Sequence, residues 1–139
     1  MYTREIDGKI YGFKFGIGFA RDMDKTVVIK DADGTQKKMG LTYAIAGLMD
    51  GDFEKLIDCL MYGNKYDSGE KIDRKQIEAW LDSEDVSLEQ ECKDLLDFFE
   101  TANFTARKVR DIKEGLDKME KLQEAQFEGQ LQKAKVGTN

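Results

Sequence analysis

The chain has 139 residues, of which 40% are hydrophobic and 36% are charged, and its formal net charge is −6 at pH 7. This length fits one domain with a core of modest depth, and the acidic balance argues against nucleic-acid binding, which requires a clustered basic surface. The absence of histidine removes the usual general base, the common nucleophile pairs and the commonest metal ligand. We therefore expect no nucleic-acid partner and no bound cofactor, and most hydrolase mechanisms are excluded.

The chain also lacks the signals of membrane insertion and of a zinc site. Its longest apolar patch, Leu41 to Met49, is far shorter than the roughly 20 residues that span a bilayer, and no apolar signal core opens the sequence. We therefore expect no membrane partner and a cytoplasmic location. Cys59 and Cys92 lie inside apolar helical patterns without CxxC spacing, which predicts buried, reduced thiols.

The N-terminal segment predicts a β-hairpin. Asp7-Gly8 is a pair that accepts the positive φ angles of a two-residue turn, and extended segments over residues 4–6 and 9–15 flank it. Tyr11, Phe13 and Phe15 alternate along the second segment. The hairpin should therefore carry one aromatic face.

A short helix and a further extended segment are predicted next. Residues 16–25 indicate the helix, and the β-branched run over residues 26–30 indicates the extended segment, which Asp31-Ala32-Asp33-Gly34 closes. This closing motif resembles a calcium loop, but its glycine falls at the fourth position instead of the sixth, and Thr42 replaces the glutamate at the twelfth. We therefore predict a turn.

Two successive helices follow. Their apolar residues recur at the i, i+3, i+4, i+7, i+8 spacing of one buried helical face: Leu41, Ala44, Ile45, Leu48 and Met49, then Phe53, Leu56, Ile57, Leu60 and Met61. Gly51 suits the break between them, and Asp52 suits the N-cap of the second helix. Gly63-Asn64 predicts the end of that helix, where a left-handed residue is favoured.

Two capping boxes predict two more helices. Asp73 with Gln76 should start a helix that runs through Leu81, and Ser87 with Gln90 should start the next. The apolar residues of this last helix repeat at helical spacing: Leu88, Cys92, Leu95, Leu96 and Phe99. The folded core should end near Asn103.

The composition changes after this point, which predicts two parts, a helical domain over residues 1–104 and a charged helical tail over residues 105–139. The tail has eight Lys or Arg and six Asp or Glu, a net charge of +2, and the preceding 104 residues hold the remaining −8. Gly115 and Gly129 each weaken a helix by about 1 kcal/mol relative to alanine, so we expect partial disorder past Glu128.

The tail carries the candidate partner-binding residues, which are Ile112, Leu116, Met119 and Leu122. A lone helix with an apolar stripe requires a groove or a partner, so these side chains should contact a client or a neighbouring subunit. The alternative is that the stripe folds back onto the body. The fold class predicted for the whole chain is mainly α with a short N-terminal β-hairpin (α+β), a small helical domain followed by a C-terminal helical tail.

Catalytic residues are not indicated. Asp22 with Asp24, and Asp50 with Asp52, are close carboxylates, but acidic pairs at helix ends are usually caps or partners of the helix dipole. We expect no catalytic, cofactor or metal site, and hence no enzyme.

The order of motifs resembles a known family. The run Ile6-Asp7-Gly8-Lys9 through Phe13-Lys14-Phe15-Gly16-Ile17-Gly18-Phe19, followed by Arg21-Asp22-Met23-Asp24-Lys25, looks like the opening of tail assembly chaperones from long-tailed phages of Gram-positive bacteria. The helix opened by Gly40-Leu41, the Leu48-Met49-Asp50-Gly51-Asp52 break and the helix over residues 72–81 match that family's layout. The resemblance covers about residues 1–104.

This resemblance implies a non-enzymatic chaperone that binds the tape measure protein during tail building, keeps it soluble, and is shed before the virion matures. It implies a homo-oligomer in the host cytoplasm and a frameshift-extended form that recruits tail tube protein. Many weak sites along an extended client would supply affinity through multivalency. No individual family residue has a role that transfers to a numbered position here.

Two functions of other classes remain open. The acidic first 104 residues favour an inhibitor that mimics nucleic acid and blocks a host enzyme, which salt-sensitive binding to a basic enzyme would support. An enzyme is the third possibility, and it rests only on scattered carboxylates. A tightly bound divalent metal ion would indicate it.

Overall fold

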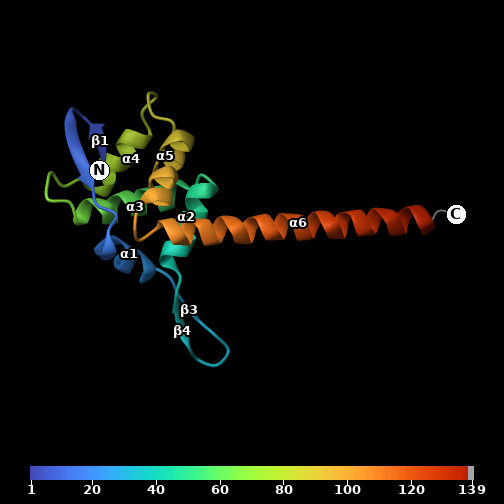
Figure 1. The fold of residues 1–139 in the computed structure, drawn as a ribbon. Helices are drawn as coiled ribbons and strands as arrows, with labels where there is room; N and C mark the ends of the chain where they lie inside the picture. The colour runs from blue at the N-terminus through green and yellow to red at the C-terminus, as the bar shows by residue number, and fades with distance from the viewer. Residues whose placement is uncertain (138–139) are drawn as a thin grey trace. The chain divides into compact units, whose positions relative to one another are not determined.

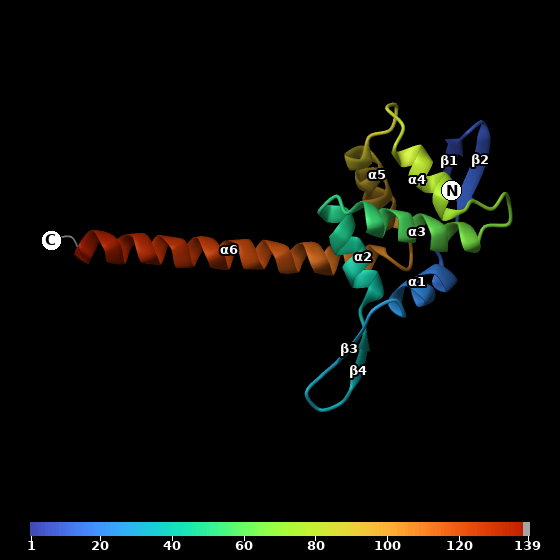
Figure 2. The same ribbon diagram turned by 180° about the vertical axis from the view of Figure 1, so that it is seen from behind.

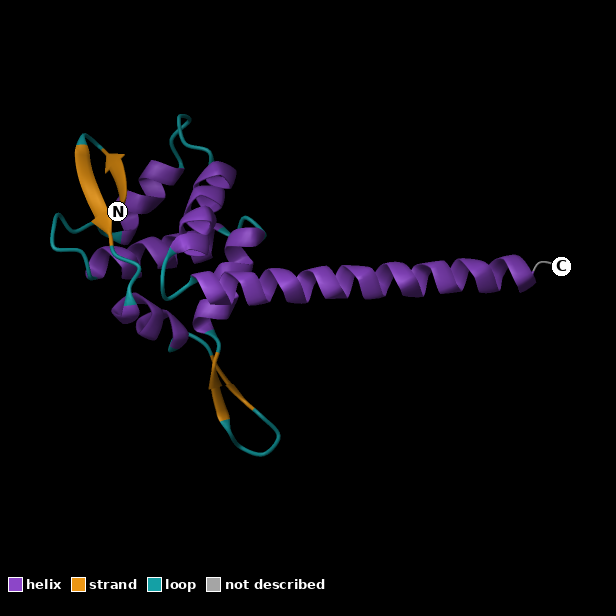
Figure 3. Ribbon diagram, viewed as in Figure 1, coloured by secondary structure: helices purple, strands orange, loops and turns teal. Residues whose placement is uncertain are grey.

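A computed structural model describes the backbone of residues 1–137 and the side chains of residues 1–132. The chain separates into two compact units, residues 1–109 (unit 1) and residues 110–139 (unit 2). Helices make up most of unit 1, and its strands are confined to two hairpins (Figure 3). The predicted fold class, mainly α with a short N-terminal β-hairpin, is confirmed.

The first hairpin pairs β1 (Tyr2–Ile6) with β2 (Lys9–Phe13), antiparallel and in a register that sets the first residue of β1 against the last of β2. The φ angles of Asp7 and Gly8 are 52° and 77°. Two consecutive positive φ angles define the tight turn whose twist matches that of paired strands. The hairpin predicted from the Asp-Gly pair is therefore confirmed.

Helix α1 (Ile17–Asp24) leads into the second hairpin, which pairs β3 (Val28–Lys30) with β4 (Gln36–Lys38). In its loop the N–H of Gly34 donates to the carbonyl oxygen of residue 31 at 3.0 Å. The predicted helix, extended segment and turn are confirmed. Neither hairpin pairs with the other, and the second stands apart from the helices of unit 1 (Figure 1).

Helices α2 (Gly40–Met49) and α3 (Phe53–Lys65) pack against each other. Gly51 makes the break between them with a φ of 73°. The side chain of Asp52 accepts a hydrogen bond from the backbone N–H of Glu54, so it is the predicted N-cap.

The predicted helix end at Gly63-Asn64 is wrong, because α3 continues through both residues. Its C-cap, Tyr66, has a φ of −94°, so no left-handed residue ends the helix. A Cβ atom on Gly63 would lie 2.4 Å from the Phe15 ring. The glycine therefore serves close packing between α3 and the chain after β2, and not a helix terminus.

Helices α4 (Arg74–Leu81) and α5 (Leu88–Thr101) follow, and α3 contacts both. The first predicted capping box is present in full. The Asp73 carboxylate accepts from the Gln76 N–H at 2.8 Å, and the Gln76 side chain accepts from the Asp73 N–H at 2.9 Å.

Only half of the second capping box forms. The Ser87 hydroxyl accepts from the Gln90 N–H at 3.1 Å, as predicted. The Gln90 side chain instead donates to the Asp94 carboxylate at 2.7 Å, one turn further along α5. A side chain on the exposed helix surface has i+4 partners as well as the N-cap, and here the charged partner forms the bond.

An aromatic cluster joins the first hairpin to α1 and α5 in the core. The Phe15 ring centroid lies 4.9 Å from that of Phe19 and 5.1 Å from that of Phe99, and Tyr2 lies 5.3 Å from Phe98. Most of these contacts are edge-to-face, the arrangement that the ring quadrupole favours. Burial raises the pKa of the Tyr2 hydroxyl well above its usual value.

A charged cluster ties the same strand to α5. The Arg4 guanidinium lies 2.8 Å from the Glu91 carboxylate and 3.1 Å from that of Asp94, and it covers the Tyr2 ring at 4.5 Å. Cys59 and Cys92 are both buried and free, as predicted. Desolvation raises the pKa of each thiol, so both favour the neutral form.

Helix α6 (Ala106–Gly137) begins in unit 1 and makes up the described part of unit 2. Thr105 and Val109 are buried in unit 1, and the Thr105 hydroxyl donates to the Phe99 carbonyl oxygen at 2.7 Å. The division into a domain over residues 1–104 and a tail over residues 105–139 stays a prediction. So does the disorder expected past Glu128, part of which falls outside the described residues.

Candidate functional site

The apolar side chains of α6 are the candidate binding surface, and all four predicted contact residues lie on this helix. Ile112 is half-buried, whereas Leu116, Met119 and Leu122 are 48%, 58% and 61% exposed. The described part of unit 2 contains no second element that could cover them. Exposed apolar side chains at helical spacing are what a helix presents to a partner groove or to another helix.

The helix brings three of the four residues to one side. At about 100° per residue, Ile112, Leu116 and Met119 fall within an arc of about 60°. Leu122 lies about 120° from Leu116, so it borders this side of the helix. The predicted set is thus one continuous face plus a flanking residue.

Two further apolar residues, which the sequence prediction left out, extend this face. Phe127 is 62% exposed and Leu131 is 47% exposed. Phe127 follows Leu116 by eleven residues, which is just over three turns, so both lie on the same side of α6. The heptad positions in this part of α6 hold glutamine, so a heptad pattern misses Phe127. An eleven-residue spacing from Leu116 identifies it. We call Ile112, Leu116, Met119, Leu122, Phe127 and Leu131 the α6 apolar face.

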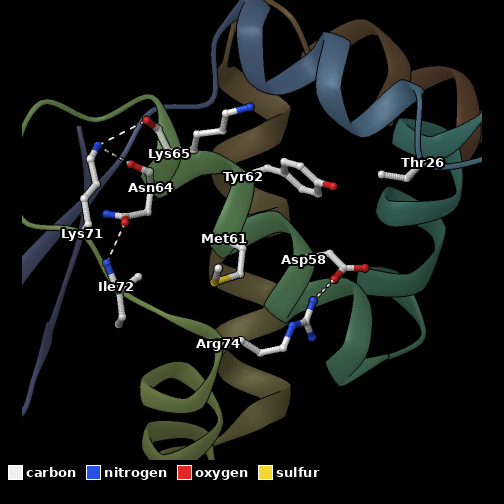
Figure 4. Close-up of a pocket in the computed structure, with 9 residues that line it drawn as sticks. All are labelled: Thr26, Asp58, Met61, Tyr62, Asn64, Lys65, Lys71, Ile72 and Arg74. Atoms are coloured by element: carbon white, nitrogen blue, oxygen red, sulfur yellow. Dashed lines mark hydrogen bonds and ion pairs between the residues drawn. The ribbon is translucent and has the colours of Figure 1, made fainter.

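Unit 1 contains a pocket of about 430 Å³ beside α3, and Figure 4 shows its lining. Arg74 lies 2.5 Å from the Asp58 carboxylate, and this hydrogen bond raises the pKa of the guanidinium. The Lys71 ammonium donates to the carbonyl oxygens of Asn64 at 3.0 Å and of Lys65 at 3.2 Å. These cations therefore satisfy carboxylates and helix-end carbonyls of their own chain.

Asn64 is the central polar residue of this pocket wall. It is 2% exposed, and its amide donates to the carbonyl oxygens of Gly12 at 2.9 Å and Glu70 at 3.0 Å. Its side-chain oxygen accepts from the N–H of Ile72 at 2.8 Å. One side chain thus connects β2, α3 and the loop before α4, which is a structural role.

The close acidic residues also serve the fold. Asp22 accepts from the Lys65 ammonium at 2.8 Å and from the Tyr66 hydroxyl at 2.7 Å, and these two bonds lower the pKa of the carboxyl. Asp24 accepts from the backbone N–H of Leu41 at the start of α2. With the Asp52 N-cap, these contacts confirm that three of the four carboxylates support helix ends or inter-element contacts.

The described part of the chain has neither a metal-binding cluster nor a membrane-spanning helix. Among the side chains of residues 1–132, no group of three or more cysteine or acidic residues is placed to hold a metal ion. No helix in that part of the chain is both long enough and apolar enough to cross a bilayer.

Comparison with protein families identifies the family of this chain. A model described as "Phage tail assembly chaperone protein, TAC" matches residues 3–114. The chain belongs to the phage tail assembly chaperone family. Comparison with curated proteins and with solved structures gives no significant match. A chaperone family is non-catalytic, which is consistent with the predicted absence of enzymatic activity.

The matched segment contains unit 1 from residue 3 onward and extends to residue 114 of α6. Ile112 lies inside it, whereas Leu116, Met119 and Leu122 lie beyond its last residue. The sequence resemblance to tail assembly chaperones is thus confirmed at the level of the family. The assignment of the α6 apolar face as the binding site of this chaperone stays a prediction.

Proposed function

We propose that this tail assembly chaperone binds the tape measure protein, keeps it soluble during tail morphogenesis, and helps to recruit tail tube subunits through a frameshift-extended form. The phage is long-tailed and its host Gram-positive. The chaperone acts as a homo-oligomer in the host cytoplasm, is absent from the mature virion, and performs no catalysis. Membership of the family, together with the uncovered apolar face of α6, supports the proposal.

The α6 apolar face contacts the client or a neighbouring subunit. Its side chains point out from a helix that carries charges of both signs, so the helix can bury apolar surface on contact while its flanks remain solvated. Burial yields roughly 25 cal/mol per Å² of apolar surface, so each contact is weak and reversible. An extended client with many such contacts is held by their number.

The test is co-expression with the tape measure protein of the same phage. We expect soluble client that co-purifies with the chaperone, and insoluble client without it. The variant Leu116→Gln/Met119→Gln/Leu122→Gln should lose most of the rescue, because glutamine preserves the helix and removes the apolar surface. A matched control, Ile10→Gln/Ile17→Gln/Val28→Gln, changes three exposed apolar residues of unit 1 and should rescue normally.

Light scattering on the same two variants shows whether the α6 apolar face contacts the client or a neighbouring subunit. A smaller oligomer from the α6 variant with full client rescue would assign the face to neighbouring subunits. Client that stays insoluble with the unmodified chain, and does not co-purify, would contradict the chaperone proposal and favour the acidic inhibitor.

A further inference from the structure

The negative charge of unit 1 is concentrated in one short stretch. Residues 78–100 contain nine Asp or Glu and a single basic residue, Lys93. Residues 1–77 contain thirteen residues of each sign. The whole net charge of the first 104 residues therefore lies on the last turn of α4, the following loop and α5.

This stretch borders an apolar hollow between α3, α4 and α5, three helices that lie next to one another (Figure 2). The hollow has a volume of about 370 Å³, and we call it the acidic hollow; its lining is Phe53, Ile57, Glu78, Leu81, Asp82 and Leu88. Phe53 is 52% exposed, and Leu81 and Leu88 are half-buried. The volume is at the small end of binding pockets and suits large apolar side chains better than a whole ligand.

The two carboxylates of the acidic hollow have no direct ion pair with a described residue. Arg74, one turn before Glu78 on α4, acts on Glu78 only at longer range, because its guanidinium is paired with Asp58. Glu78 and Asp82 are one turn apart at the C-terminal end of α4, and neither forms a salt bridge or a side-chain hydrogen bond with another described residue. The last turn of α4 contains no basic residue. Like charges at i, i+4 repel, and the negative end of the helix dipole adds to the repulsion, so a cation brought here is stabilised.

The α6 apolar face of a second copy does not supply that cation. Over residues 110–132, α6 carries four basic and six acidic residues, so this part of the helix has the same sign as the rim of the hollow. Contact between two acidic hollows would oppose carboxylates to carboxylates. Charge complementarity therefore favours a basic helix of another protein over the α6 apolar face of a second copy.

We propose that the acidic hollow binds a positively charged amphipathic helix, which inserts a large apolar side chain between Phe53, Leu81 and Leu88 and places Lys or Arg against Glu78 and Asp82. The inference rests on the proposed function for the source of this helix, which is the client. The surface is separate from the α6 apolar face and gives the chaperone a second, charge-selective contact.

A pair of synthetic peptides tests the charge selectivity. Each is an amphipathic helix of about five turns with the same leucine positions, one with lysine and one with glutamate on the flanks. In fluorescence anisotropy with the full chain, we expect the lysine peptide to bind at least about tenfold more tightly. Its affinity should fall several-fold between about 50 and about 300 mM salt. Equal binding of both peptides would overturn the proposal.

Matched variants locate the binding. Glu78→Gln/Asp82→Asn should weaken the lysine peptide by about three- to twentyfold, because two charge contacts are lost. Glu84→Gln/Asp85→Asn removes the same charge from the same stretch outside the hollow and should change the affinity by less than about twofold. Phe53→Ser should cost about tenfold, whereas Phe104→Ser, at a similarly exposed phenylalanine, should not. Equal losses in a variant and its control would contradict the location.

Client rescue distinguishes this inference from the proposed function. If the unmodified chaperone solubilises its client and Glu78→Gln/Asp82→Asn does so equally well, the hollow is not a client site and the chaperone proposal stands. If the unmodified chaperone fails to rescue the client, the proposed function fails, and the peptide titrations still decide whether the hollow binds a basic helix.

Discussion

Unit 1 and unit 2 differ in how far their apolar side chains are buried. In unit 1, aromatic and aliphatic side chains from its early and late elements are almost completely buried, as Phe19 and Phe99 illustrate with 0% exposure. In unit 2, the large apolar residues of α6 are about half exposed. Burial stabilises the first set within the monomer, whereas the second gains stability only when something covers it. The comparison predicts that equivalent substitutions have different effects in the two units.

The largest difference is expected for truncation of an apolar side chain. Phe99→Ala should lower the free energy of unfolding by about 3–5 kcal/mol, because it removes a ring from the aromatic core and leaves a cavity. Leu116→Ala in α6 should change the free energy of unfolding by less than about 0.5 kcal/mol, because this side chain is largely exposed and makes few contacts that truncation would remove. Urea denaturation of the two variants measures both values. Similar losses would show that α6 is packed in the monomer.

Loss of a buried polar side chain comes next. Asn64→Ala should destabilise unit 1 by about 2–3 kcal/mol, because it leaves the Gly12 carbonyl and the Ile72 N–H without their partner. Asn103→Ala, at an exposed position, should be nearly neutral. The same denaturation experiment applies. A neutral Asn64→Ala would mean that water replaces the amide.

Glycine-to-alanine substitutions should have opposite signs in the two units. In Gly63→Ala the new methyl group would press on the Phe15 ring, and overpacking of this kind costs about 1–3 kcal/mol. In Gly115→Ala the methyl group meets open space, and alanine favours the helix by about 1 kcal/mol. Urea denaturation checks the first, and ellipticity at 222 nm, which should rise, checks the second. A stabilised Gly63→Ala would contradict the close approach.

The smallest effect concerns pH. Because Lys65 and Tyr66 lower the pKa of Asp22 in the folded state, the unfolded state takes up the proton first as the pH falls. The stabilisation is complete above the unfolded pKa of about 4 and disappears as the pH falls through the lowered folded pKa. Asp22→Asn should therefore flatten the acid side of the stability curve slightly. Melting temperatures between pH 2 and pH 6, roughly, measure this.

The features of the fold that could be predicted are those set by neighbouring residues in the sequence. The Asp7-Gly8 turn, the Asp52 N-cap and the Asp73 capping box each depend on a few neighbouring residues, so their patterns are legible without the rest of the chain. Gly63 was assigned wrongly because its role is set by Phe15, which lies 48 residues earlier in the sequence. No local pattern contains that contact.

The candidate surfaces were also predictable only where they depend on local sequence spacing. Leu116 and Met119 could be predicted because they keep the spacing of a helix face, but Phe127 falls outside the heptad and was missed. The charge of residues 78–100 can be counted in the sequence, but the acidic hollow depends on the packing of α3, α4 and α5. Glu78 and Asp82 can be recognised as part of a binding surface only in the folded structure, where they line the same hollow as Phe53.

The contacts between β1 and α5 set an order of events during synthesis. The first hairpin is local and can form as soon as it leaves the ribosome, but its aromatic and charged partners, Glu91, Phe98 and Phe99, are made much later. Until then the sides of the Tyr2 and Phe15 rings that face α5 are uncovered. A nascent chain that stalls before α5 therefore exposes apolar surface and is prone to aggregate. This exposure ends only when α5 packs against β1.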